Sequence, residues 1–214
     1  MVLACRAVRG SAASFVVIIA LAMIVYPGGT SWDRASPGHD FWLNYLCDLA
    51  RPTALNGVPN PIGSALAQTA MAVLAIGLLP WWWLLVRLAP SQRRSGIVVR
   101  ALGTIAVLGI FGVVLLPGDR FGALHGFACV AAGVPGLTAA LVAVVALLRD
   151  RSAPRAPAWL GAITLGVASI CFALYVPDVL RLSSAVMAVA VLERISLGLL
   201  LVWMLVCSAA CRTS

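Results

Sequence analysis

Long apolar stretches, separated by short polar segments, run through the chain from one end to the other. A helix needs about 20 mainly apolar residues to cross a hydrocarbon core of roughly 30 Å, and six stretches approach or exceed that length. They cover approximately residues 12–26, 62–86, 97–116, 121–148, 158–176 and 184–207. The pattern predicts an all-α polytopic membrane protein, a six-transmembrane-helix bundle that forms a single domain over residues 1–214.

The first stretch is the shortest, and a cleaved signal peptide is the alternative because Arg6 and Arg9 precede it. The stretch ends in the sequence YPGG at residues 26–29, without the small-x-small pattern of a cleavage site. We therefore expect it to remain as the first span, with an extension back through residues 7–11.

Composition agrees with this class of protein. Hydrophobic residues make up 62% of the chain and charged residues 10%, and the mean hydropathy is +1.03. Soluble domains are about 45–50% apolar and about 25% charged, so a water-soluble domain is excluded. Disorder is excluded as well, because disordered chains have low hydrophobicity.

The arginines of the chain lie mainly on one side of the predicted membrane. The side that carries both termini has ten arginines and one aspartate, a balance of +9, whereas the other side has four arginines and five aspartates, a balance of −1. The positive-inside rule then predicts cytoplasmic termini in a bacterial inner (plasma) membrane. We interpret the formal charge of +8 as an orientation signal. We expect membrane lipids as partners and no nucleic acid.

Residues 27–61 form the one predicted loop that is long enough to carry structure of its own. Ser36 can cap a helix, and the proline that follows suits a first helical position. We expect a short interfacial helix over residues 37–49, on which Asn44 and Asp48 form a polar row. Two interpretations stay open: the row faces water at the membrane surface, or it turns inward over the mouth of the bundle.

Glu193 and Arg194 are charged residues inside the last predicted span. Glu193 follows Ser184 by nine residues, which places it roughly 14 Å deep and near the midplane. Ionised groups are costly there. Because adjacent helix positions point about 100° apart, we expect each residue to need a separate partner, or Glu193 to be protonated. A structural network and a role with a proton, ion or substrate are both open, and either one requires the pair to face the interior.

His125 lies one turn into the fourth span, shortly after Asp119. Its structural interpretation is a hydrogen bond to a neighbouring helix or to the outer turn. Its functional interpretation is a general base or metal ligand that works with Asp119 or Asp48. A zinc site of His125 and Asp119 is weakly supported, because His39 is the only other histidine. We expect no metal and no other cofactor.

Three consecutive tryptophans, residues 81–83, lie near the end of the second span and just before Arg87. Tryptophans at such positions are typical of the aromatic belt at a membrane surface. We expect a belt here rather than a stacking site for a ligand.

Several short motifs are distributed along nearly the whole chain. They are the sequences YPGG at 26–29, NYLCDL at 44–49, NG at 56–57 with Asn60, PGD at 117–119 before His125, and the pair Glu193-Arg194. Together they resemble the bacterial six-span integral membrane family filed as domain of unknown function 998. The resemblance implies a six-helix bundle and brings no established activity. Cys47 stands where that family is expected to have a serine.

Three classes of function remain open. We favour a non-enzymatic protein that binds a lipid or small amphiphile in an outward-opening polar pocket. The alternatives are a proton-coupled small transporter that uses Glu193, and an intramembrane hydrolase that acts on lipid head groups through Asp48, Asp119 and His125. All three share the hypothesis that one pocket is lined by Asn44, Asp48, Asp119, His125, Glu193 and Arg194.

Overall fold

The computed structural model describes residues 1–179 and 187–213, and this part of the chain is helical with no strand. Six helices are long and apolar enough to cross a membrane. They are α1 (Val2–Val25), α3 (Pro61–Arg87), α4 (Arg93–Leu115), α6 (Ala123–Arg149), α7 (Arg155–Val179) and α8 (Met187–Thr213). The predicted fold class is therefore confirmed, and the chain is a multi-pass integral membrane protein.

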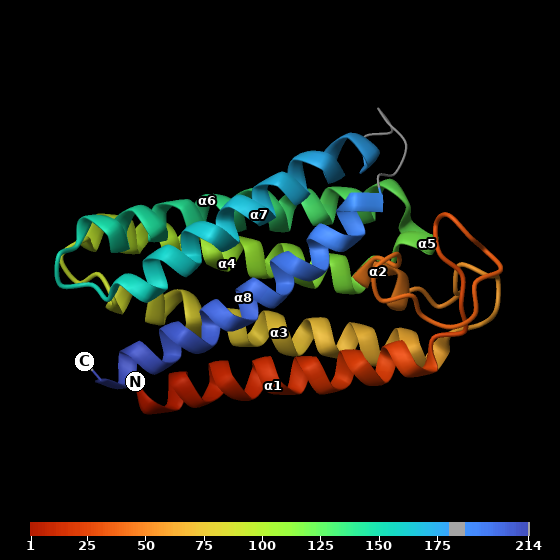
Figure 1. The fold of residues 1–214 in the computed structure, drawn as a ribbon, viewed down its shortest axis with the longest axis horizontal. Coiled ribbons are helices and arrows are strands. Elements are labelled where there is room, and N and C mark those ends of the chain that lie inside the picture. Colours follow the sequence, from red (N-terminus) through yellow and green to blue (C-terminus); the bar gives the residue numbers. More distant parts are fainter. Residues whose placement is uncertain (180–186, 214) are drawn as a thin grey trace.

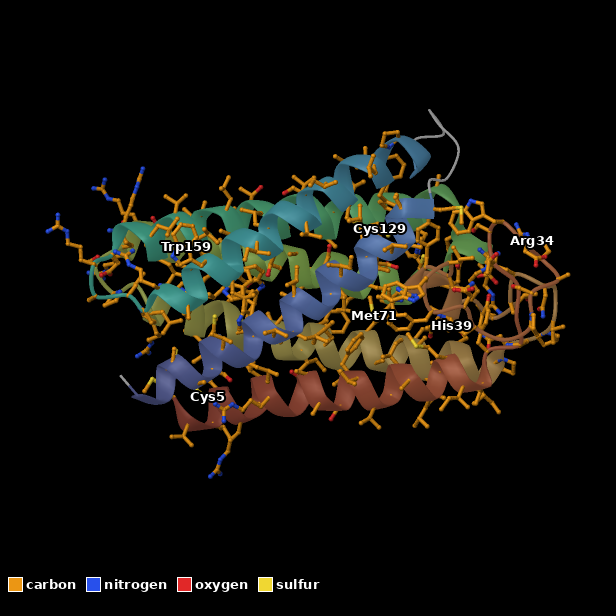
Figure 2. The ribbon with its side chains drawn as sticks, in the orientation of Figure 1. Cys5, Arg34, His39, Met71, Cys129 and Trp159 are labelled. Carbon is orange, nitrogen blue, oxygen red and sulfur yellow. The ribbon has the colours of Figure 1, made fainter. Side chains whose placement is uncertain are left out.

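The six long helices form one bundle, and both termini lie at the same end of it (Figure 1). Around the bundle, α1 packs on α3, α3 on α4, α4 on α6, α6 on α7 and α7 on α8, and α8 contacts α1 and α3. The end with the termini is called the terminal end. The opposite end carries the long loop of residues 26–60, called the cap; Figure 2 shows Arg34 and His39 there and Cys5 at the terminal end.

Some helix boundaries differ from the predicted spans. Helix α1 begins ten residues earlier than residue 12, so it contains Arg9. The Arg9 Nε atom donates a hydrogen bond to Ser208 Oγ on α8 at 2.9 Å. The fourth predicted stretch is divided into a short helix α5 (Gly118–Phe121) and α6, which are separated by Gly122 with a φ of 48°. The predicted start of the last span, at residue 184, lies outside the described residues.

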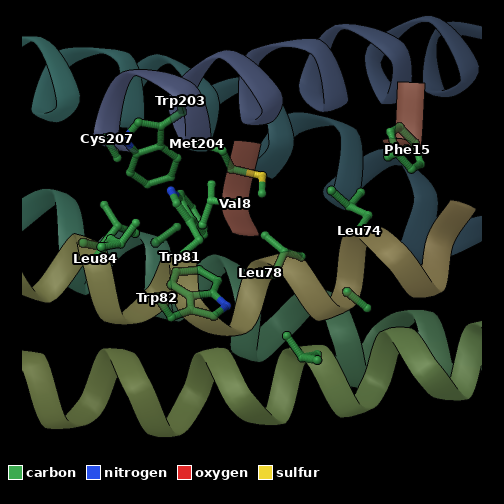
Figure 3. Close-up of a cluster of buried hydrophobic side chains, with 14 of the residues drawn as sticks. Val8, Phe15, Leu74, Leu78, Trp81, Trp82, Leu84, Trp203, Met204 and Cys207 are labelled. Carbon is green, nitrogen blue, oxygen red and sulfur yellow. The ribbon is translucent and has the colours of Figure 1, made fainter. Parts of the chain in front are cut away.

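The tryptophan triplet is not an aromatic belt. Trp81 and Trp82 are buried in the core, where the Trp81 ring lies 4.9 Å from that of Trp203 on α8 (Figure 3). Only Trp83 is exposed, and the Arg100 guanidinium lies 5.1 Å from the centre of its ring. The belt prediction was wrong for two of the three residues because consecutive helix positions point about 100° apart, so one can face lipid while two face the bundle.

Glycines let the helices around this core approach one another closely. A Cβ atom added at Gly103 of α4 would collide with the Trp82 ring, and one added at Gly109 would lie 2.5 Å from the backbone nitrogen of Ala132. The indole of Trp82 and the backbone of α6 occupy the space that side chains would fill. Small residues therefore set the spacing of α3, α4 and α6.

The cap is a compact loop rather than the predicted helix over residues 37–49. Its one helix is α2 (Leu46–Leu49), and residues 41–44 form turns. Helix α2 begins at this point because the Asp48 side chain accepts a hydrogen bond from the Tyr45 backbone N–H at 2.8 Å. Asn44 instead donates across the cap to the Gly29 carbonyl oxygen at 2.8 Å, so this turn is held by tertiary contacts.

Gly28 and Gly29 allow the two halves of the cap to come together. Their φ angles are 136° and 86°, a region that L side chains rarely adopt. A Cβ atom on Gly29 would also collide with the backbone nitrogen of Asn56. Asn56 and Gly57 form the turn that the sequence predicts, and Gly57 has a φ of 85°.

Candidate functional site

A cavity of about 400 Å³ lies inside the bundle. Its walls come from α3, α4, α6, α7 and α8, and α2 of the cap covers one end through Tyr45, Leu46 and Cys47. The other end is lined by three tryptophans, Trp81, Trp82 and Trp203. Its volume lies within the range of roughly 300–1,000 Å³ that is typical of ligand sites.

Polar side chains gather at the cap end of this cavity. They include Gln68, Cys129, Tyr175, Glu193 and Ser196, and Tyr45 and Cys47 of the cap lie at the same end. The remaining wall is formed mainly by alanine, leucine, isoleucine, valine and phenylalanine side chains. Further along, the Thr164 hydroxyl donates to the Leu160 carbonyl of its own helix at 2.8 Å and is thereby satisfied. The cavity is therefore apolar along most of its length and polar at the end that meets the cap.

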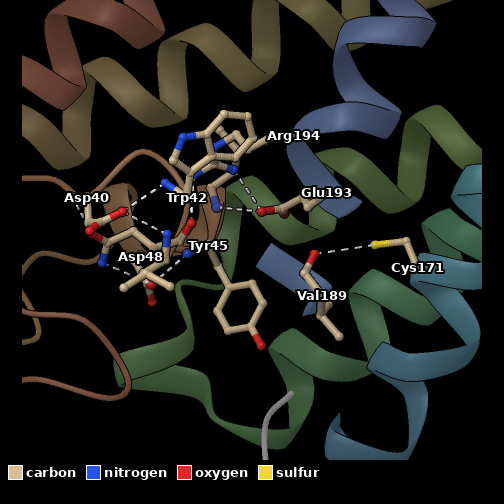
Figure 4. Close-up of polar contacts among 11 residues, drawn as sticks. Asp40, Trp42, Tyr45, Asp48, Cys171, Val189, Glu193 and Arg194 are labelled. Atoms are coloured by element: carbon tan, nitrogen blue, oxygen red, sulfur yellow. Dashed lines mark hydrogen bonds and ion pairs between the residues drawn. The ribbon is translucent and has the colours of Figure 1, made fainter. Parts of the chain in front are cut away.

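Glu193 and Arg194 pair directly and hold the cap against α8 (Figure 4). Glu193 Oε2 accepts hydrogen bonds from Arg194 Nη1 at 2.9 Å and from the Leu46 backbone N–H at 2.9 Å. Arg194 Nη2 donates to the Asn44 carbonyl oxygen at 2.7 Å. The expectation that the two adjacent side chains do not pair with each other was wrong, because the long Arg194 side chain bends back toward Glu193. Each residue does have the separate partner that was expected, the Leu46 N–H for Glu193 and the Asn44 carbonyl oxygen for Arg194.

The two side chains of this pair have different surroundings. The Arg194 side chain keeps 3% of its surface exposed, whereas the Glu193 side chain keeps 30%. Glu193 also lines the cavity, and Arg194 does not. The pair thus presents its carboxylate to the cavity and encloses its guanidinium beneath the cap.

Within the described part of α8, Glu193 lies nearer to the cap end than to the middle of the helix. It follows Met187, the first described residue of α8, by six positions, which is about 9 Å along the helix axis. Its contact with Leu46 places it at the cap end, because the cap folds down onto α8. The depth expected from the sequence was counted from residue 184, which lies outside the described residues, so it stays a prediction.

Asn44 and Asp48 both face the protein interior, which was one of the two interpretations left open. Asn44 is fully buried and Asp48 is 5% exposed. Burial raises the pKa of Asp48, and hydrogen bonds from the Tyr45 backbone and the Asn44 side chain partly oppose this effect. Their hydrogen bonds lie within the cap, so these side chains shape the cap rather than line the cavity.

His125 and Asp119 lie at the cap end on α6 and α5. His125 is 7% exposed, with Nδ1 2.7 Å from the Leu116 carbonyl oxygen and Nε2 3.7 Å from Cys129 Sγ. The Asp119 Oδ2 atom lies 3.4 Å from the Thr53 backbone nitrogen, which donates to it. No hydrogen bond or ion pair joins His125 to an aspartate within the described residues, and none of their His, Cys, Asp and Glu side chains form a group of three placed to hold a metal ion.

Of the six predicted site residues, Glu193 is the one that lines the cavity. The other five surround its cap end: Asn44, Asp48, Asp119, His125 and Arg194. The candidate site predicted from the sequence did not include the tryptophan end of the cavity or the polar residues Tyr175 and Ser196. Hydropathy cannot separate a side chain that faces a cavity from one that faces lipid, although a tyrosine within a span is a weak signal.

Comparison of the chain with family models, with curated proteins and with solved structures finds no match. The function is therefore inferred from the cavity, the cap and the charged pair between them.

Proposed function

We propose that this membrane protein binds a lipid or another small amphiphile in the cavity between its helices. The observation that carries the proposal is the distribution of polarity along a cavity of about 400 Å³, apolar except at the end beside the cap. A ligand that is apolar along most of its length and polar at one end matches that distribution. Its chain lies toward Trp81 and Trp203, and its polar group lies near Glu193.

The proposal includes an orientation, with both termini cytoplasmic and the cap outside the inner membrane of a bacterium. It is supported by the arginine-rich ends of α3, α4 and α6, which lie at the terminal end (Figure 1), and by the positive-inside rule. In this orientation the polar end of the cavity is on the outer side, so an amphiphile of the outer leaflet would place its head group beside the cap.

We also propose membership in the six-span family filed as domain of unknown function 998. The motifs that carry the resemblance support it, because most of them build one structure, the cap and its attachment. Gly29 packs on the turn at Asn56, Asn60 Nδ2 donates to the carbonyl oxygens of Leu49 and Arg51 at 3.1 and 3.0 Å, and Glu193 binds the backbone of α2.

Proton-coupled transport is the second candidate function, and one observation favours it. Glu193 lines the cavity and at the same time accepts a hydrogen bond from the Leu46 backbone. Protonation of the carboxylate would remove its charge and weaken its pairing with Arg194 and with the cap. Uptake that depends on pH in the natural protein and not in Glu193→Gln is the result expected of this candidate.

Fluorescence quenching tests whether an amphiphile enters the cavity. Replacing the four tryptophans that do not line it with phenylalanine leaves emission from the cavity tryptophans alone; the replaced residues are Trp32, Trp42, Trp83 and Trp159. Dodecanol that carries a terminal bromine is then added at trace levels to protein in unbrominated nanodiscs. We expect saturable quenching, because the bromine reaches the tryptophan end of the cavity.

Two substitutions on α7 make this test specific. Ala168→Phe places a ring in the cavity and is expected to reduce the saturable quenching at least fivefold. Ala173→Phe adds the same ring at an exposed position of the same helix and should leave the quenching unchanged. Quenching that does not saturate, or that both variants reduce equally, would contradict binding in the cavity.

A further inference from the structure

The charge that a ligand meets in this cavity is negative. Glu193 is the one charged side chain among the described residues that line it. Both hydrogen bonds to its carboxylate, from Arg194 and from the Leu46 backbone, reach Oε2. Oε1 accepts none from the described residues, so this oxygen is available to a donor inside the cavity.

The positive partner of Glu193 is turned away from the cavity. Arg194 uses Nη1 for Glu193 and Nη2 for the Asn44 carbonyl oxygen, and its guanidinium lies 5.7 Å from the centre of the Phe41 ring in the cap. Its Nε atom is buried without a partner on this enclosed side. A ligand carboxylate would therefore approach the carboxylate of Glu193 before it could reach the guanidinium, and like charges in a desolvated site repel each other strongly.

A second polar group at this end lacks a partner. Ser196 follows Glu193 by three residues, so it lies about one helical turn further along α8. Its side chain lines the cavity, and its buried hydroxyl oxygen has no hydrogen-bond partner. A head-group hydroxyl can donate to Glu193 Oε1 and accept from the Ser196 hydroxyl, and an ammonium group can donate to both oxygens. Either head group would satisfy these two groups, as buried polar groups normally are.

The dimensions of the cavity fit one acyl chain. Trp203 follows Glu193 by ten residues on α8, which is about 15 Å along the helix axis and half of a hydrocarbon core of roughly 30 Å. The volume of about 400 Å³ lies near the lower end of the roughly 300–1,000 Å³ of ligand pockets, so the cavity is narrow for its length and favours a ligand with one chain.

From these observations we propose that the cavity selects a single-chain amphiphile whose head group is a hydrogen-bond donor without negative charge, such as an alcohol or an amine, over a fatty-acid anion. The inference rests on the proposed function and specifies the ligand class. Selection against the anion comes from the unpaired face of the Glu193 carboxylate, and selection for the donor comes from Glu193 and Ser196 together.

A series of ligands with one chain and three head groups tests the selection. Dodecanol, dodecylamine and laurate each compete with the brominated probe for the tryptophan-reduced protein at pH 8. We expect the alcohol and the amine to displace the probe at concentrations at least tenfold lower than laurate. Laurate binding as tightly as dodecanol would overturn this inference and leave amphiphile binding intact, whereas displacement by none of the three would overturn the proposed function as well.

Two variants assign the selection to its residues. Glu193→Gln keeps a carbonyl oxygen for the Leu46 N–H and removes the charge, so laurate should compete within about threefold of dodecanol. Ser196→Ala leaves the Glu193–Arg194 pair intact, and it should weaken dodecanol severalfold without changing laurate. Exposed Ser169→Ala on α7 is the matched control and should change neither ligand. Unaltered selectivity in folded Glu193→Gln, or equal weakening of both ligands by Ser196→Ala, would contradict the assignment.

Discussion

Each end of the bundle buries one aspartate, and the two carboxylates differ in the number of hydrogen bonds that they accept. At the terminal end, Asp150 Oδ2 accepts hydrogen bonds from the backbone and side chain of Ser91 at 3.0 and 2.6 Å, and Oδ1 accepts two from Ser152 at 2.9 and 2.6 Å. At the cap end, Asp48 Oδ2 accepts one strong bond from the Tyr45 backbone and a long one from Asn44.

These contacts give the two carboxyl groups pKa shifts of opposite sign. Hydrogen bonds from the side chains of Ser152 and Ser91 lower the pKa of Asp150 well below its usual range. Burial raises the pKa of Asp48. At the terminal end, Asp150 joins the loop between α3 and α4 to the loop between α6 and α7, and both of its oxygens accept hydrogen bonds. At the cap end, charged groups with fewer hydrogen-bond partners lie beside the cavity. We therefore expect ligand binding at the cap end.

We expect the loss of Arg194 to lower the free energy of unfolding more than the other substitutions that test the two ends. Arg194→Met leaves the Glu193 carboxylate without its ion pair and the Asn44 carbonyl oxygen without a donor. Breaking a buried pair from one side costs about 3–5 kcal/mol, which unfolding by heat or denaturant in detergent would measure. Arg120→Met, at an exposed position of the same end, should change stability by less than about 0.5 kcal/mol. Equal stability of the two variants would show that the pair does not hold the cap.

Substitution of Asp150 tests the terminal end and should have a smaller effect. Asp150→Ala removes the acceptor of four hydrogen bonds and should lower the melting temperature at pH 7, by less than Arg194→Met does. Because its pKa is lowered in the folded protein, the stabilisation is present above the unfolded pKa of about 3.9 and is lost as pH falls below it. The difference between variant and natural protein should therefore be constant from pH 5 to 8. Exposed Arg151→Ala is the control, and a difference that varies across this range would contradict the account.

The change of protein stability with pH that arises in the cap should be the smallest of these effects. Burial and then the charge of Arg194 lower the pKa of His39 to about 4, below the unfolded value of about 6.5. The unfolded chain binds more protons between these values, so stability is complete above pH 6.5 and falls as pH decreases toward 4. We expect a loss of about 1 kcal/mol, since the ring is partly exposed and solvent screens the effect.

His39→Gln should flatten this pH profile. Asp48→Asn should instead make the rise of stability with pH steeper. The raised pKa of Asp48 makes its contribution to stability decrease as pH rises above about 3.9, and the substitution removes that contribution. Melting temperatures measured from pH 4 to 7 in one detergent distinguish the two variants. An unchanged profile for His39→Gln would exclude the imidazole as the source of the dependence.

The number of spans and their approximate positions followed from sequence because a bilayer imposes a local requirement. Each span must be long and apolar whatever its neighbours are, and all six stretches contain a helix in the structure. The turn at Asn56 and Gly57 was predictable for a similar reason, since a short sequence favours it. The inward placement of Asn44 and Asp48 was one of two open interpretations, because a short amphipathic segment can lie on the membrane or on the protein.

The cavity and the cap depend on contacts between residues that are far apart in the chain. Trp82 is buried because Gly103 on another helix leaves room for it, and Glu193 reaches the cap because residues 147 positions apart meet at Leu46. No local pattern encodes such a contact, since hydropathy measures the cost of leaving water and does not identify the surface that a side chain meets. The sequence thus specifies a six-span membrane protein with a few costly charges, and tertiary packing decides that one of those charges faces a cavity.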